Sequence, residues 1–440
     1  MAKPALPIRS LADRNCRQFV LFRVLFNARF YYPVLAILFL DLGLSATQYT
    51  LLNFVWALAI VFAEVPSGVL ADRIGRRPLV VAAGACMVAE MGVLCVAPLN
   101  GGLLLFLFCL VNRILSGLAE ALASGADESL AFDSLAAEGR AGEWPRVLAE
   151  VMHWQSLGMV VAMLVGSAVY DPDLLNRLGA YAGFAFRFDQ GTTLRFPIYL
   201  NLITALAVLA VSLGMQEPAR KERAAVPSAK QALQSVLEAG AWIARTPLAL
   251  FVIVGGLLID SVIRLFLTFG STYYRLIGLP EASYGLIGAG LAGLGMLVSP
   301  LARRLVASGS VLRAYLVLAC LALFGLLGLV LNLPLWGVAF TIPLAAAIAA
   351  VGFAVSHYLN AAVDSRQRAT VLSFKGLAFN LGYGFVSLLF ALALRAYRDT
   401  SSASDGFAAA LALLPVWFVF TVLVLALFFW RHRAVLRHRY

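Results

Sequence analysis

The sequence predicts an all-α membrane protein with twelve transmembrane helices, and two observations carry that prediction. Of the 440 residues, 62% are hydrophobic and 13% are charged, whereas a soluble domain is about half apolar and about a quarter charged. The apolar residues also gather in runs of about 20 residues, the length that one spanning helix needs. We place these runs at 19–42, 48–71, 79–98, 102–126, 147–170, 197–214, 247–270, 283–301, 311–331, 335–358, 371–394 and 407–430.

The first run resembles a secretory signal peptide only in that basic residues precede it. It contains Arg23, Asn27 and Arg29, and no small-residue cleavage pattern follows, so we assign it as the first transmembrane helix. Pro33 is expected to loosen this helix near its middle. Beside it, Tyr31 offers a hydroxyl and a flat ring to a bound solute.

A tight basic turn joins the second and third runs. It reads Gly68-Val69-Leu70-Ala71-Asp72-Arg73-Ile74-Gly75-Arg76-Arg77-Pro78. Its charges need water, phosphate headgroups or one another, so the turn must lie at a membrane surface. The two glycines allow the helix ends to approach closely and the backbone to reverse.

This turn resembles the G-x-L-A-D-R-x-G-R-R motif between helices two and three of the major facilitator superfamily. The resemblance implies two pseudo-symmetric six-helix bundles around a central site near the membrane midplane. A weak second copy supports the duplication, because Ser299-Pro300-Leu301-Ala302-Arg303-Arg304 follows the eighth run where Ser67 to Arg73 follows the second.

In this family, an acid near the inner end of helix four pairs with the arginines of the turn. We therefore match Asp133 with Arg76 or Arg73, and expect Asp72 to accept hydrogen bonds at a helix end of the second half. The resemblance implies that these residues hold the halves together in the outward-open state. We call this set the latch: Gly68, Asp72, Arg73, Gly75, Arg76, Arg77 and Asp133.

Charges recur on one face of the fourth run. Arg113, Gly117, Glu120, Ser124 and Asp127 follow at steps of four, three, four and three, which aligns them along one helix stripe. Since a charge at the bilayer centre costs about 3 kcal/mol or more, the stripe must face a wet cavity or partner charges. The Arg113-x-x-x-Gly117 spacing also resembles a pattern of proton-linked members, in which the arginine adjusts the proton affinity of a nearby acid.

Helices one, four, seven and ten line the central pathway in this family. Asp260 and Arg264 lie one turn apart in the seventh run and are expected to neutralise each other. The resemblance thus implies a pathway set of Arg29, Tyr31, Arg113, Glu120, Asp260 and Arg264. For Glu64, Glu90, Lys375 and Asn380 we favour packing or snorkelling over a coupling role.

Residues 215–246 interrupt the apolar series. They contain a basic stretch, a capping-box pattern formed by Ser228 and Gln231, and apolar residues at helical spacing, so we expect a helix along the inner membrane surface. This linker separates an N-terminal bundle, residues 1–214, from a C-terminal bundle, residues 247–440.

The positive-inside rule orients the chain. With both termini cytoplasmic, only a minority of the 34 Lys and Arg residues lie in outer loops: Arg177, Arg187, Arg195, Arg275, Arg395 and Arg398. A basic face against the anionic lipid of an inner membrane accounts for the net charge of +11 without nucleic acid.

These features predict a monomeric secondary transporter of a small organic solute, driven by the proton gradient through alternating access. We favour export of drug-like or amphipathic compounds, although the run 147–170 has glycines at Gly158 and Gly166 but lacks the proline usual in helix five of drug–proton antiporters. The alternatives are a transporter of an organic anion or lipid-like metabolite, and a non-transporting receptor or scaffold. The sequence presents no nucleotide-binding loop, nucleophile constellation or metal-ligand spacing, so neither an enzyme nor a bound cofactor is expected.

Overall fold

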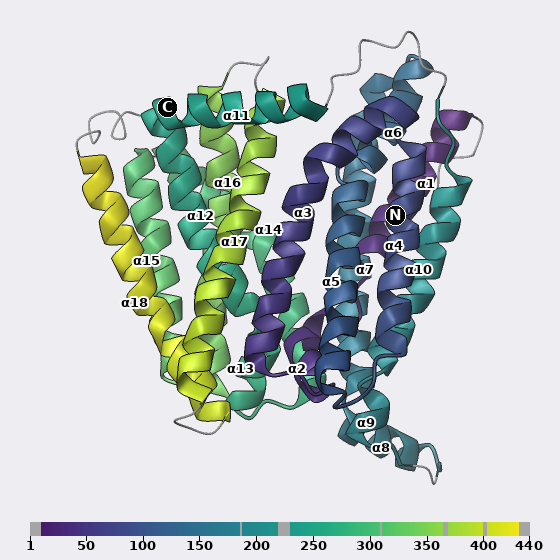
Figure 1. Cartoon of the computed structure of the whole chain (residues 1–440), viewed down its shortest axis with the longest axis vertical. Coiled ribbons are helices and arrows are strands. Elements are labelled where there is room, and N and C mark those ends of the chain that lie inside the picture. The colour runs from purple at the N-terminus through teal and green to yellow at the C-terminus, as the bar shows by residue number, and fades with distance from the viewer. Residues whose placement is uncertain are drawn as a thin grey trace.

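The computed structural model describes residues 10–184, 187–218, 229–308, 310–363, 368–398 and 403–430. Within these ranges the chain is helical, without strands (Figure 1). Twelve helical stretches are long and apolar enough to cross a membrane, from Leu11–Asp41 to Asp405–Phe429. The chain is therefore a multi-pass membrane protein.

The elements divide at residue 214 into two halves joined by a linker. The first half contains α1 (Leu11–Asn27), η1 (Tyr32–Val34), α2 (Leu35–Asp41), α3 (Ala46–Ile74), α4 (Arg77–Cys95), α5 (Gly102–Ala123), α6 (Ala126–Ala137), η2 (Ala141–Glu143), α7 (Trp144–Tyr170), α8 (Pro172–Tyr181), α9 (Gln190–Thr193) and α10 (Phe196–Gly214). The linker contains α11 (Ala229–Arg245). The second half contains α12 (Pro247–Thr268), α13 (Gly270–Leu276), η3 (Glu281–Ser283), α14 (Tyr284–Ser308), α15 (Val311–Val330), η4 (Trp336–Phe340), α16 (Thr341–Ala362), α17 (Arg368–Arg398) and α18 (Ala403–Phe429).

The first span is broken rather than merely loosened. α1 begins at Leu11, well before the expected start, and ends at Asn27; helical structure resumes only at Tyr32. Pro33 supplies no N–H donor and disfavours helix before it. The Phe30 N–H instead donates to Asn201 Oδ1 at 3.0 Å. The break places Arg29 on non-helical backbone, where its side chain turns into the protein.

The fourth span is also interrupted, which corrects the expected continuous stripe. α5 ends at Ala123, Gly125 adopts a left-handed conformation with φ of 72°, and α6 begins at Ala126. Glycine is the residue that accepts this conformation at no steric cost. Asp127 therefore lies on a different helix from Arg113.

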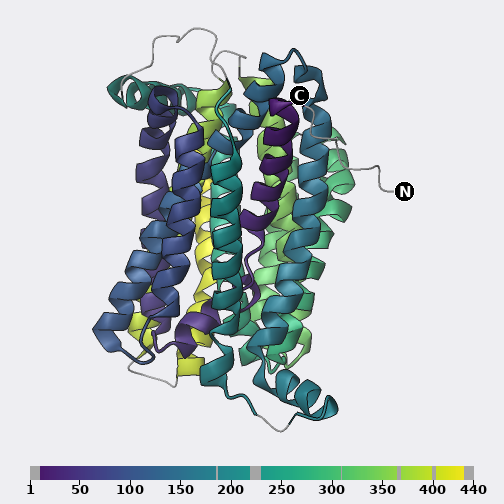
Figure 2. The same ribbon diagram turned by 90° about the vertical axis from the view of Figure 1, so that its right-hand side faces the viewer.

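The linker helix α11 lies across the ends of the spanning helices, whereas α8 projects beyond the bundle at the opposite end (Figures 1 and 2). Gly240 of α11 packs against the Phe374 ring of α17, and α11 also contacts α3. It thus touches both halves. The predicted cap at Ser228 lies outside the described residues.

The most extensive contacts between the halves are made by two helix pairs, α3 with α17 and α7 with α14. At the second pair the approach is so close that a Cβ on Gly285 would lie 2.2 Å from Met163 O. We call the end that carries α2, α8 and α13 the outer end, after the orientation predicted from the basic residues.

Candidate functional site

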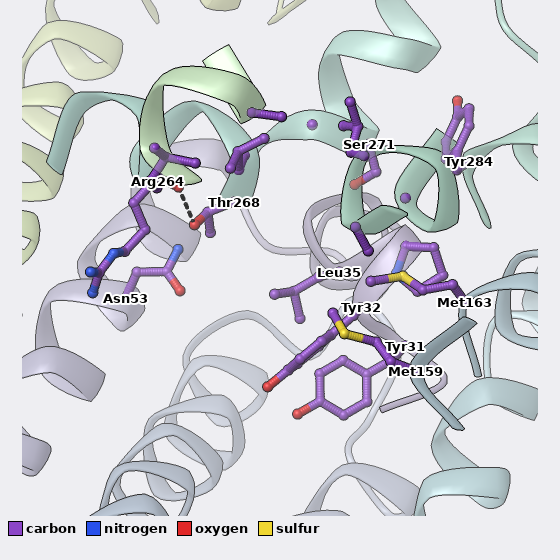
Figure 3. A pocket seen from close by; sticks show the side chains of 18 of the residues that line it. Tyr31, Tyr32, Leu35, Asn53, Met159, Met163, Arg264, Thr268, Ser271 and Tyr284 are labelled. Carbon is purple, nitrogen blue, oxygen red and sulfur yellow. Dashed lines mark hydrogen bonds between the residues drawn. The ribbon is translucent and has the colours of Figure 1, made fainter. Parts of the chain in front are cut away.

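A cavity of about 650 Å³ lies between the two halves. Tyr31, Tyr32, Asn53 and Trp56 border it from the first half, as do Met159 and Met163 of α7, and Arg264 and Tyr284 border it from the second (Figure 3). Its wall is mostly apolar and aromatic, with few polar groups. This is the composition of sites that bind small organic molecules.

The predicted pathway residues divide between this wall and the layer behind it. Tyr31, Arg113 and Arg264 line the cavity. Arg29, Glu120 and Asp260 do not border it directly. Each of the latter three carries an ion-pair contact to another charged residue.

Arg29 is the centre of a buried charge cluster. Its side chain is 1% exposed, and its guanidinium lies 3.3 Å from Glu90 Oε2 and 3.9 Å from Glu120 Oε1. Tyr31 donates its hydroxyl proton to the other Glu90 oxygen at 3.3 Å. Glu90, for which sequence reasoning favoured a packing role, is thus the main partner of Arg29. We call Arg29, Tyr31, Glu90 and Glu120 the charge cluster.

Glu120 differs from Glu90 in its surroundings. The Glu90 side chain is fully buried, whereas that of Glu120 is 37% exposed although it lies on a spanning helix. On α7, Met152 and Trp154 are both exposed. The charge cluster therefore has one fully buried carboxylate and one that is partly exposed.

Arg113 lies against an aromatic ring, and no ion pair to a carboxylate is seen for it among the described residues. Its guanidinium carbon lies 4.7 Å from the centre of the Phe39 ring. Nε and Nη2 are buried without a hydrogen-bond partner among the described residues. The nearby carboxylates pair with Arg29 instead. Gly117, on the same helix, packs against α3, where a Cβ would lie 2.6 Å from Ala59 Cβ.

The seventh span shows the expected neutralisation. Arg264 Nη2 lies 2.6 Å from Asp260 Oδ2, and Arg264 Nη1 donates to Asn380 Oδ1 at 3.1 Å. Asp127 at the start of α6 also lies 2.6 Å from Arg23 of α1. Sequence analysis did not predict this ion pair. The pattern within either helix alone gave no signal for that contact.

The latch forms the expected ion pair between Arg76 and Asp133. Arg76 also donates to Ser129 O at 3.0 Å, and Arg77 donates to Met215 O at 2.6 Å. Glu217, which sequence analysis did not identify as a partner, accepts from the Arg77 N–H at 2.8 Å. These contacts hold the turn to its own half.

The latch glycines differ in their surroundings. Gly75 has φ of 101°, as the reversal requires. A Cβ on Gly68 would meet no atom within 4 Å, so the close helix approach expected at Gly68 is absent in this conformation.

The halves are tied at the outer end by a polar cluster that sequence analysis missed. Arg275 of α13 pairs with Asp41 of α2 and with Glu281 of η3. Tyr170 donates to Asp41 at 2.5 Å, and Asp171 accepts from the Ala282 N–H at 3.0 Å. We call Asp41, Tyr170, Asp171, Arg275 and Glu281 the outer lock.

Arg275 stays charged within the outer lock. Burial lowers its pKa, but hydrogen bonds and charges from Asp41 and Glu281 raise it by more, so the net shift is upward. The outer lock thus joins the two halves at the outer end through contacts of the charged Arg275 guanidinium.

Comparison with known proteins places this chain in a class of membrane transporters. The model of the Major Facilitator Superfamily matches residues 19–387. The chain belongs to the Major Facilitator Superfamily, whose members transport small solutes. No curated protein matches the sequence.

Solved structures agree with the fold. The crystal structure of the nucleoside transporter NupG is similar with a TM-score of 0.74 and 13% identity, covering 95% of this chain and 99% of that one. A bacterial homologue of the human lysosomal transporter Spinster, in an inward-facing and unoccupied conformation, gives a TM-score of 0.66 and 17% identity, covering 96% and 97%. At such identities, the likeness concerns the fold alone.

Proposed function

We propose that this transporter moves a small organic solute across the inner membrane by alternating access, driven by the proton gradient, as a monomer with both termini in the cytoplasm. The outer lock closes one side of the cavity. In this proposal the solute enters from the other side, where Met152 and Trp154 of α7 are exposed. A wall of aromatic and apolar groups suits an organic solute better than an inorganic ion.

The observation that carries proton coupling is the charge balance of the charge cluster. One cation, Arg29, lies between two carboxylates. Glu90 is sealed and held by both Arg29 and Tyr31. Because an uncompensated charge inside the protein is costly, a proton on Glu120 stabilises the cluster by making it neutral. Glu120 is accordingly the proton carrier, and Arg29 is its counter-ion.

The direction we propose is export, in which protons enter as the solute leaves. The apolar wall suits an amphipathic compound that reaches the cavity from the inner side. The alternative of organic-anion transport rests on Arg113, which lines the cavity. A receptor or scaffold without transport would have no use for a solvent-accessible carboxylate next to a buried ion pair.

Proteoliposomes test this proposal. A labelled compound is chosen by a thermal-shift screen against drugs, siderophores, sugars and organic acids, since ligand binding stabilises the folded state. Under antiport, an acidic lumen drives accumulation of the compound above the level at symmetric pH. Glu120→Gln should abolish this gradient-driven accumulation and retain exchange at symmetric pH.

Glu150→Gln is the matched control, because Glu150 is 40% exposed and pairs with Arg146 at the inner end of α7. It should behave as the wild type. Wild-type flux that ignores the gradient would overturn proton coupling. Gradient-driven accumulation that survives in Glu120→Gln would remove Glu120 from the coupling mechanism.

A further inference from the structure

Two buried donors on the cavity wall have no acceptor among the described residues. Arg113 of α5 is 5% exposed, and its Nε and Nη2 make no hydrogen bond. Asn53 of α3 is 3% exposed, and its Nδ2 makes none either. Both residues line the cavity. Buried polar groups are nearly always paired, so two orphaned donors at one cavity call for an explanation.

The two donors lie at the same level of neighbouring helices. α3 and α5 both run from the outer end inward, and they touch where a Cβ on Gly117 would lie 2.9 Å from Trp56 O. Arg113 precedes Gly117 by one turn, and Asn53 precedes Trp56 by about one turn. The packing of α3 against α5 thus brings both donors to the same depth of the cavity.

Among the described residues, no carboxylate forms an ion pair with Arg113. Arg264 is the other charged residue on the described wall, and Asp260 neutralises it. Phe39 covers one face of the Arg113 guanidinium. A ring face stabilises a cation but leaves the N–H groups at the guanidinium edge unpaired. These edge donors match the two oxygens of a carboxylate.

We propose that Arg113 and Asn53 bind the carboxylate of an amphipathic organic anion. The apolar body of that anion lies against the tyrosines and methionines of the same cavity. The guanidinium edge donates to both carboxylate oxygens, and the Asn53 amide donates to one of them. This assignment rests on the proposed transport function and names the substrate class of the same cavity.

In the free transporter, a buried Arg113 guanidinium without a bound anion is energetically unfavourable. A bound carboxylate removes this penalty. An amide or an amine on the same body does not. Selectivity for the carboxylate therefore follows from the charge of the empty site. Arg113 is available for this role because the two carboxylates of the charge cluster, Glu90 and Glu120, lie against Arg29 instead.

Binding to the purified full-length transporter tests this inference without any gradient. The probes are aryl-alkyl carboxylates with phenyl or naphthyl bodies, each compared with its primary amide and its amine. We expect the carboxylates to bind more tightly than their amides. Arg113→Gln should weaken carboxylate binding on the order of 10- to 100-fold, as expected for a lost charge-assisted bond, and leave amide binding unchanged.

Arg113→Lys keeps the charge without the fork-shaped donor edge, so it should retain part of the preference and guards against a folding defect in the first variant. Arg313→Gln, an exposed arginine at the start of α15, controls for the loss of one positive charge and should bind as the wild type. Asn53→Ala should weaken carboxylates more than amides.

Equal binding of carboxylates and amides, or a preference that persists in Arg113→Gln, would overturn the assignment. Equal stabilisation by sodium sulfate or phosphate, which lack an apolar body, would reassign the site to inorganic anions and also overturn it. These outcomes are independent of proton coupling, because no pH gradient enters the measurement. A transporter that prefers carboxylates yet ignores the gradient would keep this inference and lose the proposed coupling.

Discussion

Arg275 of the second half donates two hydrogen bonds of 2.7 Å each to the two carboxylate oxygens of Asp41 in the first half. The two residues are 234 positions apart in the chain. A two-pronged contact between a guanidinium and a carboxylate is both strong and directional. It joins the two halves at the outer end, and the proposed alternating access requires it to break.

Asp41→Asn should therefore favour the state that opens outward. Removing one partner of a charged hydrogen-bonded pair costs about 1.5–3 kcal/mol, which corresponds to a shift of roughly tenfold or more in the equilibrium between states. A cysteine at the cavity residue Leu35 should then react faster with an impermeant maleimide added from outside. Asp173→Asn on exposed α8 is the control. An unchanged labelling rate in Asp41→Asn would mean that the outer lock does not hold this state.

Gly285→Ala should act in the same direction through packing. The added methyl would lie 2.2 Å from Met163 O and 2.3 Å from Ser167 Oγ, so α14 must move away from α7. Gly290→Ala on the same helix meets no atom within 4 Å and serves as the matched control. We expect faster outside labelling of the Leu35 reporter in Gly285→Ala alone. Equal labelling of the two variants would show that this contact does not couple to opening.

The spans were predictable and the contacts between them only partly so. The length of a spanning helix follows from the length of its apolar run. The spanning stretches therefore agree with the predicted segments. The Asp260–Arg264 pair was also predictable, because both partners share one helix face. In contrast, the partner of Arg29 lies 61 positions away on α4. The spacing of residues within one segment does not indicate which other helix packs against it.

Two predictions of an unbroken helix were wrong. The break after Asn27 depends on Asn201 capturing the Phe30 N–H, which is a tertiary contact. The turn at Gly125 ends α5 although the polar spacing continues through it. Helical periodicity assumes an unbroken helix, so the stripe from Arg113 to Asp127 was extended past the real helix end.

Glu90→Gln should lower the thermal stability of the purified protein more than any exposed carboxylate variant. It leaves Arg29 buried without its main counter-ion, and breaking a buried pair in this way costs about 3–5 kcal/mol. The double variant Arg29→Met with Glu90→Leu should recover part of the loss, because neither charge remains. A melting temperature for Glu90→Gln equal to that of Glu150→Gln would contradict the assignment of Glu90 as the main partner.

Asp72→Asn and Arg76→Ala should impair transport with little loss of substrate binding. Arg76 pairs with Asp133 and Arg77 reaches Met215 O, far from the residues that line the cavity. Transport is measured in proteoliposomes and binding by thermal shift in detergent, with Arg313→Gln as the control. A loss of binding as large as the loss of transport would contradict the separation of the latch from the cavity.

The measurement that tests the account most directly follows both ends of the cavity at once. Spin labels at Asp173 and Leu335 report the outer end, and labels at Met152 and Ser356 report the inner end; all four residues are exposed. Electron–electron distances are measured in nanodiscs at alkaline and at acidic pH. One of the two distances, at the outer or the inner end, should increase as the other decreases. In Glu120→Gln, both distances should stay near their acidic-pH values. Distances that stay fixed, or that change in the same direction, would contradict proton-coupled alternating access.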